Sequence, residues 1–269
     1  MKVARTIAEL REALEPVRLS GERIGLVPTM GALHQGHLSL VRAAREACDI
    51  VVLSLFVNPA QFARGEDIAA YPRDEMGDRA AAEAEGVDLF FAPTEQEMYP
   101  EGFDTWVDPG KIGTYLEGAA RPGHFRGVAT VCTKLFALVR PQLAFFGRKD
   151  AQQVAVVKQV VRDLALTVEI VACPTQRDAD GLALSSRNVL LSAGERTAAL
   201  ALPQALEAGL KAHRAGEDAV RAARNVLDAE PGLNVDYVAI ADLDGLTLAA
   251  AVLVGSTRLI DNVRLVEEA

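Results

Sequence analysis

Two histidines stand where a strand-like run of the sequence gives way to a helix-like run. The stretch VPTMGALHQGHLSLVRAARE, residues 27–46, places His34 and His37 on either side of Gln35 and Gly36. An imidazole can donate a directed N–H and adds positive charge when protonated. The start of a helix presents unpaired backbone N–H groups and the positive end of its dipole. The pattern therefore predicts a site for an anion such as phosphate, with two ordinary loop histidines as the plain alternative.

A pair of amides follows the next apolar run. SLFVNPAQF, residues 54–62, carries Asn58 and Gln61, whose neutral side chains can both donate and accept. This pair suits a polar organic substrate, although Asn and Gln beside a proline are also common in turns.

A lysine cluster lies further along the chain in FFGRKDAQQ, residues 145–153. Lys149 is a mobile cation suited to phosphate, and a solvated lysine is the alternative. Asp150 could accept hydrogen bonds from ribose hydroxyls or cap a helix. Gln153, three residues on, is expected on the same side as Asp150.

The fourth cluster is DGLALSSRN, residues 180–188. Ser185, Ser186 and Arg187 supply two hydroxyls and a fork of N–H donors that suits phosphate oxygens. A simple helix cap with a solvent-facing arginine is the alternative.

Apolar runs that alternate with helical patterns must position these clusters. Such runs, without polar alternation, indicate a parallel sheet covered by helices on both faces, a doubly wound α/β domain. In that architecture ligands bind beyond the carboxyl ends of the strands. The expected strands are residues 23–29, 49–57, 87–93, 143–147 and 166–172, and the expected helices are residues 1–18, 37–47, 74–86, 124–140 and 150–165.

The pattern changes after Pro174. Helical patterns over residues 192–216 and 217–230 precede strand-like runs at 235–242 and 257–266, which indicates a smaller α+β domain. We therefore expect domains at residues 1–175 and 176–269.

Composition narrows the class of protein. The 269 residues are 50% hydrophobic and carry a net charge of −9, which argues against a nucleic-acid-binding face. Three well-separated cysteines without a CxxC pair suggest neither a zinc site nor a disulfide framework. There is no signal-peptide pattern and no run near the roughly 18 apolar residues of a membrane span. We expect a soluble, cytoplasmic protein that uses neither nucleic acid nor a membrane.

The clusters together resemble one enzyme family. PTMGALHxGH, FVNPxQF, YPR, HFRGV, FFGxKDxQQ and DGLAxSSRN, in this order and spacing, are similar to the pantothenate synthetases (pantoate–β-alanine ligases) of the HxGH nucleotidylyltransferase superfamily. The resemblance is dense over residues 20–195. It implies a Rossmann-like domain that binds ATP and pantoate, followed by a smaller lid domain. It also implies a homodimer that makes pantothenate, AMP and pyrophosphate from (R)-pantoate, β-alanine and ATP, through a pantoyl adenylate, for coenzyme A biosynthesis.

The resemblance also implies roles for individual residues. His37 would donate a proton, His34 and Lys149 would stabilise the charge of departing pyrophosphate, and Arg187 would close over the phosphates. Gln61 and Gln153 would bind pantoate, Gln61 would also contact β-alanine, and Asn58 would support that pocket. Asp78 would contact the Mg²⁺ that accompanies ATP. The residues that would bind ATP are Met30, Gly31, Ala32, Leu33, His34, Gln35, Gly36, His37, Gly147, Arg148, Lys149, Asp150, Gln176, Leu184, Ser185, Ser186 and Arg187.

Two positions depart from the family pattern, and other functions stay open at this point. Leu184 stands where the family usually has Met, and Gly77 stands beside Asp78 where relatives often have another acid. His124 and Arg126 match the family, but we interpret them as part of a helix start. The alternatives are another nucleotidyltransferase acting on a phosphorylated acceptor, a tRNA synthetase, and a nucleotide-binding sensor without catalysis.

Overall fold

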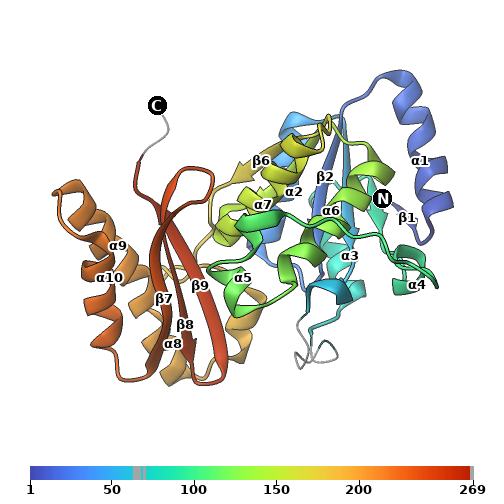
Figure 1. The fold of residues 1–269 in the computed structure, drawn as a ribbon. Helices are drawn as coiled ribbons and strands as arrows, with labels where there is room; N and C mark the ends of the chain where they lie inside the picture. The colour runs from blue at the N-terminus through green and yellow to red at the C-terminus, as the bar shows by residue number, and fades with distance from the viewer. Residues whose placement is uncertain (63–67, 69–70, 267–269) are drawn as a thin grey trace. The chain divides into compact units, whose positions relative to one another are not determined.

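The computed structural model describes residues 1–62, 68 and 71–266, and the chain divides into two compact units (Figure 1). Unit 1 comprises Met1–Gly147 and Gln153–Cys173, and unit 2 comprises Arg148–Gln152 and Pro174–Ala269. Each unit has its own sheet and its own apolar core.

Unit 1 is built on a six-stranded parallel sheet of order β1-β4-β3-β2-β5-β6. Because all strands run the same way, the carboxyl ends of β2, β3 and β5 lie at one edge of the sheet. The register pairs Thr29 with Leu55 at the ends of β2 and β3. The strands are β1 (Lys2–Ala4), β2 (Ile24–Thr29), β3 (Ile50–Leu55), β4 (Leu89–Phe91), β5 (Leu143–Gly147) and β6 (Glu169–Cys173).

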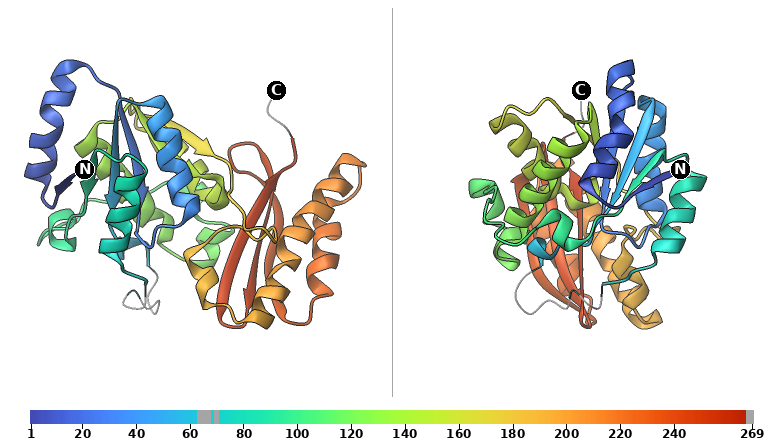
Figure 2. Two further views of the ribbon diagram at one scale, coloured as in Figure 1. Left: turned by 180° about the vertical axis from the view of Figure 1, so that it is seen from behind. Right: turned by 90° about the vertical axis from the view of Figure 1, so that its right-hand side faces the viewer.

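Helices cover both faces of this sheet (Figure 2). Leu26 belongs to one buried cluster and the next residue, Val27, belongs to another, as the two-residue period of a strand requires. The first cluster takes side chains from α1 (Ile7–Ser20), α6 (His124–Val139) and α7 (Ala151–Asp163), and the second from α2 (Gln35–Ala47) and α3 (Glu75–Ala84). Shorter elements are η1 (Pro59–Gln61), α4 (Glu95–Met98), η3 (Gly110–Gly113) and α5 (Glu117–Ala120).

Unit 2 is a three-stranded antiparallel sheet with helices packed against it. Its strands are β7 (Leu233–Asp242), β8 (Leu246–Val254) and β9 (Thr257–Arg264), in that order across the sheet. The helices α8 (Ala193–Ala199), α9 (Ala201–Arg214) and α10 (Ala219–Asp228) share one buried cluster with the strands. Two short turns complete the unit, η4 (Arg148–Asp150) and η5 (Ser186–Leu190).

The expected fold class is confirmed, with corrections to individual elements. The run read as a helix from residue 1 begins instead with the short edge strand β1 and becomes helical at Ile7. The pattern over residues 192–216 forms two helices, α8 and α9. The central strand β8, LTLAAAVLV, was not expected, because its three alanines favour a helix and hide the β pattern.

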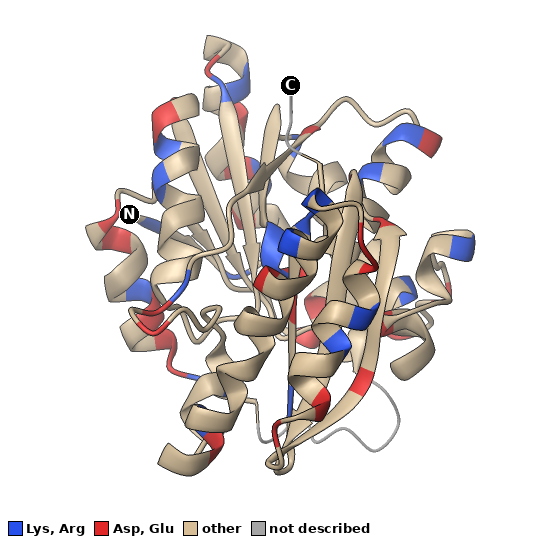
Figure 3. Ribbon diagram, turned by 90° about the vertical axis from the view of Figure 1, so that its left-hand side faces the viewer, with Lys and Arg blue, Asp and Glu red and all other residues tan. Residues whose placement is uncertain are grey.

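Charge is distributed over both units. Lys and Arg are interspersed with Asp and Glu along the helices and strands (Figure 3). In the part of the chain that the structure describes, no helix is both long and apolar enough to cross a membrane.

Candidate active site

The loop that joins β2 to α2 is held by hydrogen bonds on both sides. Thr29 anchors its start, because the hydroxyl donates to the carbonyl of Ser54 at 2.8 Å. Asp78, on the first turn of α3, accepts from the backbone N–H of Ala32 at 2.9 Å and of Leu33 at 2.6 Å. Gly31 and Ala32 have φ angles of 87° and 53°, in the left-handed region where a non-glycine residue is strained. Asp78 therefore fixes a turn that the backbone would not adopt readily by itself.

The Asp78 carboxylate and the two N–H groups from which it accepts form what we call the Asp78 clamp, and burial affects its electrostatics. The Asp78 side chain is only 4% exposed. Burial raises the pKa of its carboxyl, and the N–H donors of Leu33 and Ala32 oppose this effect. A Cβ placed on Gly31 would lie 2.9 Å from Asp78 Oδ2, so the carboxylate sits directly against the glycine backbone.

Both histidines of the HxGH stretch use Nδ1 to cap the helix that follows. His34 Nδ1 accepts from the N–H of Gly36 at 3.1 Å, and His37 Nδ1 accepts from the N–H of His34 at 3.3 Å. The two rings lie 4.1 Å apart between centroids. A neutral imidazole that accepts at Nδ1 carries its proton on Nε2. The hydrogen-bond pattern thus assigns an Nε2–H donor to each ring at the start of α2.

Asn58 is a supporting residue whose four hydrogen-bonding positions are all satisfied within the protein. Its Nδ2 donates to Gln61 Oε1 at 3.1 Å and to the Gly127 carbonyl at 3.2 Å. Its Oδ1 accepts from Ala60 N–H at 3.2 Å and from the Tyr99 hydroxyl at 2.8 Å. Burial raises the pKa of Tyr99, which keeps this hydroxyl protonated as a donor.

These bonds set the direction of the Gln61 amide. Because Gln61 Oε1 accepts from Asn58, its Nε2 points the other way and lies 2.8 Å from the Met30 sulfur. The Gln61 carbonyl is held in turn by His124 Nδ1 at 2.7 Å and by Arg121 at 3.3 Å. Gln61 therefore presents an N–H donor beside Met30 of the β2–α2 loop.

The structure shows which residues sequence reasoning missed here. The sequence singles out neither Tyr99 nor Arg121, and it gives His124 only a place at a helix start. His124 does begin α6, but it is buried and its ring also holds the Gln61 backbone. The HFRGV motif was the available signal for His124, whereas Tyr99 lies 41 residues from Asn58 in a stretch with no motif.

Gly127 allows α6 to approach η1 closely, which gives a first prediction. A Cβ on Gly127 would lie 2.2 Å from the Ala60 carbonyl oxygen and 2.6 Å from the Gln61 nitrogen. We expect Gly127→Ala to displace Gln61 and to lower kcat/KM for the substrate that the Gln61 amide contacts by about tenfold or more, as small misplacements do. Steady-state kinetics with any other substrate at saturation measures this. The control is Gly194→Ala, because a Cβ on that α8 glycine meets nothing within 4 Å, and equal rates for the two variants would contradict the prediction.

The remaining predicted residues of unit 1 lie at the end of β5 and at the start of α7. Gly147 ends that strand and pairs in register with Cys173 of β6. Gln153 lies half-buried in the first turn of α7.

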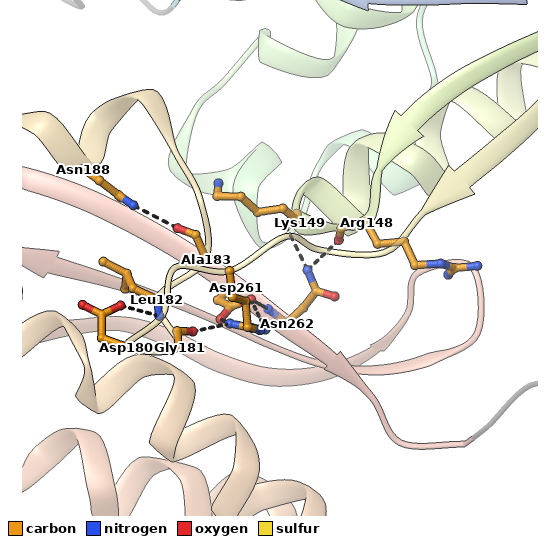
Figure 4. A network of polar contacts seen from close by, with 10 residues as sticks. Arg148, Lys149, Asp180, Gly181, Leu182, Ala183, Asn188, Asp261 and Asn262 are labelled. Carbon is orange, nitrogen blue, oxygen red and sulfur yellow. Dashed lines mark hydrogen bonds and ion pairs between the residues drawn. The ribbon is translucent and has the colours of Figure 1, made fainter. Parts of the chain in front are cut away.

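Unit 2 holds the predicted lysine segment. Arg148, Lys149 and Asp150 form η4, and the carbonyls of Arg148 and Lys149 accept from Asn262 Nδ2 at 2.8 and 2.9 Å (Figure 4). The Arg148 guanidinium binds the Asp244 carboxylate at 3.2 Å. The Lys149 side chain extends away from Asn262.

The serine–arginine loop, residues 180–188, belongs to the same unit. The Ser185 hydroxyl caps η5 by accepting from the N–H of Arg187 at 3.2 Å, and Arg187 is exposed. The N–H of Leu184 donates to the Gln176 carbonyl at 2.9 Å, which ties the loop to its own start.

Comparison with known proteins covers nearly the whole chain. The family model for pantoate–β-alanine ligase matches residues 2–264. A pantothenate synthetase of Roseiflexus sp. (strain RS-1) is 56% identical over 276 residues, which cover 97% of this chain and 98% of the relative. One of Moorella thermoacetica is 50% identical over 277 residues, covering 98% of each chain.

Solved structures match equally fully. The crystal structure of a Thermus thermophilus pantothenate synthetase has a TM-score of 0.92 and 48% identity, covering 98% of this chain and 99% of that one. A Francisella tularensis pantoate–β-alanine ligase, complexed with β-γ ATP and β-alanine, has a TM-score of 0.84 and 33% identity, covering 98% of each chain.

Proposed function

The chain belongs to the pantoate–β-alanine ligase family and is an enzyme that condenses pantoate with β-alanine, and from this premise we propose that it does so through a pantoyl adenylate formed from ATP. The Francisella relative, complexed with β-γ ATP and β-alanine, supports the use of ATP. The observation within this chain that carries the proposal is the pair of imidazoles whose Nδ1 atoms accept backbone N–H groups at the start of α2.

The chemistry explains why an adenylate is needed. A carboxylate repels an incoming amine and has no adequate leaving group. A pantoate carboxylate oxygen attacks the α-phosphorus of ATP, the bond from that phosphorus to the bridging oxygen breaks, and pyrophosphate leaves. The β-alanine amine then attacks the acyl carbon, the bond from that carbon to the AMP oxygen breaks, and AMP leaves as the amine loses a proton. Neither step needs a nucleophile from the enzyme, so the rate enhancement depends on positioning and charge stabilisation.

We assign the charge-stabilising roles to four side chains of the motifs. His37 donates a proton or hydrogen bond from Nε2 as pyrophosphate departs, and His34 supplies a second Nε2–H. Lys149 adds positive charge at the phosphates, and Arg187 adds a fork of donors.

We assign the binding roles in the same way. Gln61 donates from Nε2 to pantoate or β-alanine, with Asn58 fixing its amide, and Gln153 binds pantoate. Gly147 and Asp150 hold the ribose, and the backbone of Gln176 contacts adenine. Residues 30–37 and Arg148 contact ATP, and Leu184, Ser185 and Ser186 close over the phosphates.

Mg²⁺ is expected to accompany ATP, because it offsets phosphate charge. Asp78 is the residue assigned to it by resemblance, but the geometry suits this carboxylate to the loop. Both oxygens accept backbone N–H groups, and the side chain is almost fully buried. Among the described residues, no group of three or more His, Cys, Asp and Glu could hold a metal ion. We therefore propose that Asp78 holds the loop rather than the metal.

We also propose that the enzyme is a cytoplasmic homodimer that supplies pantothenate for coenzyme A. Its three cysteines are all buried free thiols, as expected in a reducing compartment. The dimer rests on the family resemblance, and analytical ultracentrifugation of the purified protein tests it.

The test of the adenylate is to separate the two half-reactions. With ATP and pantoate but no β-alanine, the enzyme should catalyse exchange of labelled pyrophosphate into ATP, and AMP release should then require β-alanine. ATP binding without exchange or AMP release would indicate a nucleotide sensor. AMP release that needs β-alanine but shows no pantoate-dependent exchange would overturn the adenylate.

A further inference from the structure

Two adjacent residues of β9 hold the two segments of unit 2 to which ATP binding is assigned. Asn262 donates both protons of its amide, one to the carbonyl of Arg148 at 2.8 Å and one to that of Lys149 at 2.9 Å. The close-up shows these bonds joining the strand to the lysine segment (Figure 4). The Asn262 side chain thus fixes two consecutive peptide groups of the segment in which Lys149 carries the cation.

Asp261 holds the second segment, the serine–arginine loop, through Arg177. Its carboxylate is only 1% exposed and accepts from Arg177 in a fork, at 2.6 and 3.1 Å. Arg177 also donates to the Gly181 carbonyl at 3.1 Å, and it forms a β-bridge with Ala183. This bonding fixes the loop that leads directly into Ser185 and Arg187.

The strand that carries both residues is itself well anchored. Asp261 and Asn262 pair in register with Ala250 and Ala249 of β8, the central strand of the sheet. The N–H of Asn262 also donates to Asp261 Oδ1 at 2.8 Å, which couples the two residues. Neighbouring residues of a strand point to opposite faces, so the pair can hold two different segments.

We propose that Asp261 and Asn262 are positioning residues for the adenylation step, with Asn262 acting through Lys149 and Asp261 acting through Arg177 on the serine–arginine loop. The proposal rests on the phosphate roles assigned to Lys149 and Arg187 above. A lysine side chain has a flexible four-carbon stem, so its reach is set by where its own backbone is held. Anchoring both segments on one strand keeps the cation and the loop in a fixed mutual arrangement.

The first test removes the two donors of Asn262. We expect Asn262→Ala to lower kcat/KM for ATP by about tenfold in pantoate-dependent pyrophosphate exchange, the scale of a misplaced charge stabiliser. Asn262→Asp should lower it further, because carboxylate oxygens would face two carbonyls. The matched control is Asn234→Ala, at an exposed asparagine of β7 in the same sheet, which should stay within about twofold. Rates for Asn262→Ala equal to those of the control would overturn the proposal.

A double-mutant cycle separates positioning from general stability. If Asn262 acts through Lys149, its replacement should have little further effect in a Lys149→Ala background, so the two losses should not add. Additive losses, together with a lowered Tm, would show a structural role only and overturn the proposal. Lys149→Ala with normal rates would instead refute the phosphate role of the lysine. If Lys149→Ala is slow while Asn262→Ala keeps normal rates, the positioning role of Asn262 is refuted and the phosphate role of Lys149 stands.

Hydrogen exchange gives a readout that does not depend on activity. Asn262→Ala should raise amide exchange chiefly in peptides covering residues 145–153. Asp261→Asn, which puts an amide against the guanidinium of Arg177, should raise it chiefly over residues 176–188. A uniform rise across unit 2 in both variants would contradict the assignment of one segment to each residue.

Discussion

Replacing His37 by alanine is expected to slow the proposed formation of pantoyl adenylate by about 10²-fold or more, the scale of removing a positioned acid or a charge stabiliser. The physical reason is the ring geometry: Nδ1 accepts the His34 N–H, so the proton of the ring is on Nε2. Pantoate-dependent pyrophosphate exchange measures this step without the amine reaction. Lys149→Ala should show a loss of similar size, because the role proposed for Lys149 is to add positive charge at the phosphates.

Two further variants sharpen this prediction. His37→Gln keeps an N–H donor but cannot release a proton in the relevant pH range. If His37 transfers a proton, this variant should stay slow. If His37 only donates a hydrogen bond, the variant should recover much of the rate. His213→Ala is the control, since that histidine lies in the last turn of α9. Near-normal exchange by both His37→Ala and Lys149→Ala would show that the assigned roles are wrong.

The local part of the fold could be predicted from sequence, and the non-local part could not. Strand β5 was expected at residues 143–147 and is found there, because a short apolar run between a proline and a glycine has few alternatives. β1 is only three residues long and pairs with β4, whose Leu89 stands opposite Lys2, which no local pattern reveals. β8 is alanine-rich and becomes a strand because β7 and β9 flank it.

The candidate site shows the same difference between residues with a local sequence signal and residues without one. Residues of the HxGH and SSRN stretches are recognisable because their types and spacing suit phosphate. The residues that hold them carry no such signal: Asn262 lies 113 residues from Lys149, and Asp261 lies 84 residues from Arg177. A supporting asparagine or aspartate on a strand looks like any other polar residue until the fold brings its partner alongside.

The clamp at Asp78 gives the second large prediction. Asp78→Asn replaces one carboxylate oxygen by an NH₂ group, so either Ala32 or Leu33 loses its acceptor and meets another donor. The turn at Gly31 and Ala32 has positive φ angles and leads straight to His34, so its release should misplace both imidazoles. We expect kcat/KM for ATP to fall by about 10²-fold, as for a displacement of about 1 Å.

The control and the metal titration decide what Asp78 does. Asp74→Asn changes the N-cap of the same helix, where asparagine caps as well as aspartate, so it should remain near normal. If Asp78 holds the loop, the Mg²⁺ concentration for half-maximal rate should be unchanged in Asp78→Asn. A large rise in that concentration with a normal kcat at saturating Mg²⁺ would instead show the metal contact that the resemblance implies.

The pH dependence of Asp78 provides an independent check, because stability and activity should respond in opposite directions. Burial raises the pKa of this carboxyl above its ordinary value of 3.8, so its contribution to stability is present below 3.8 and is lost as pH rises through the raised value. The unfolding free energy of the wild type, relative to Asp78→Asn, should therefore increase as pH falls through that window. Activity should decrease over the same window, because the protonated oxygen is a weaker acceptor for the N–H of Ala32 or Leu33. Denaturant unfolding and exchange kinetics on both proteins measure the two trends, and parallel trends would contradict the clamp.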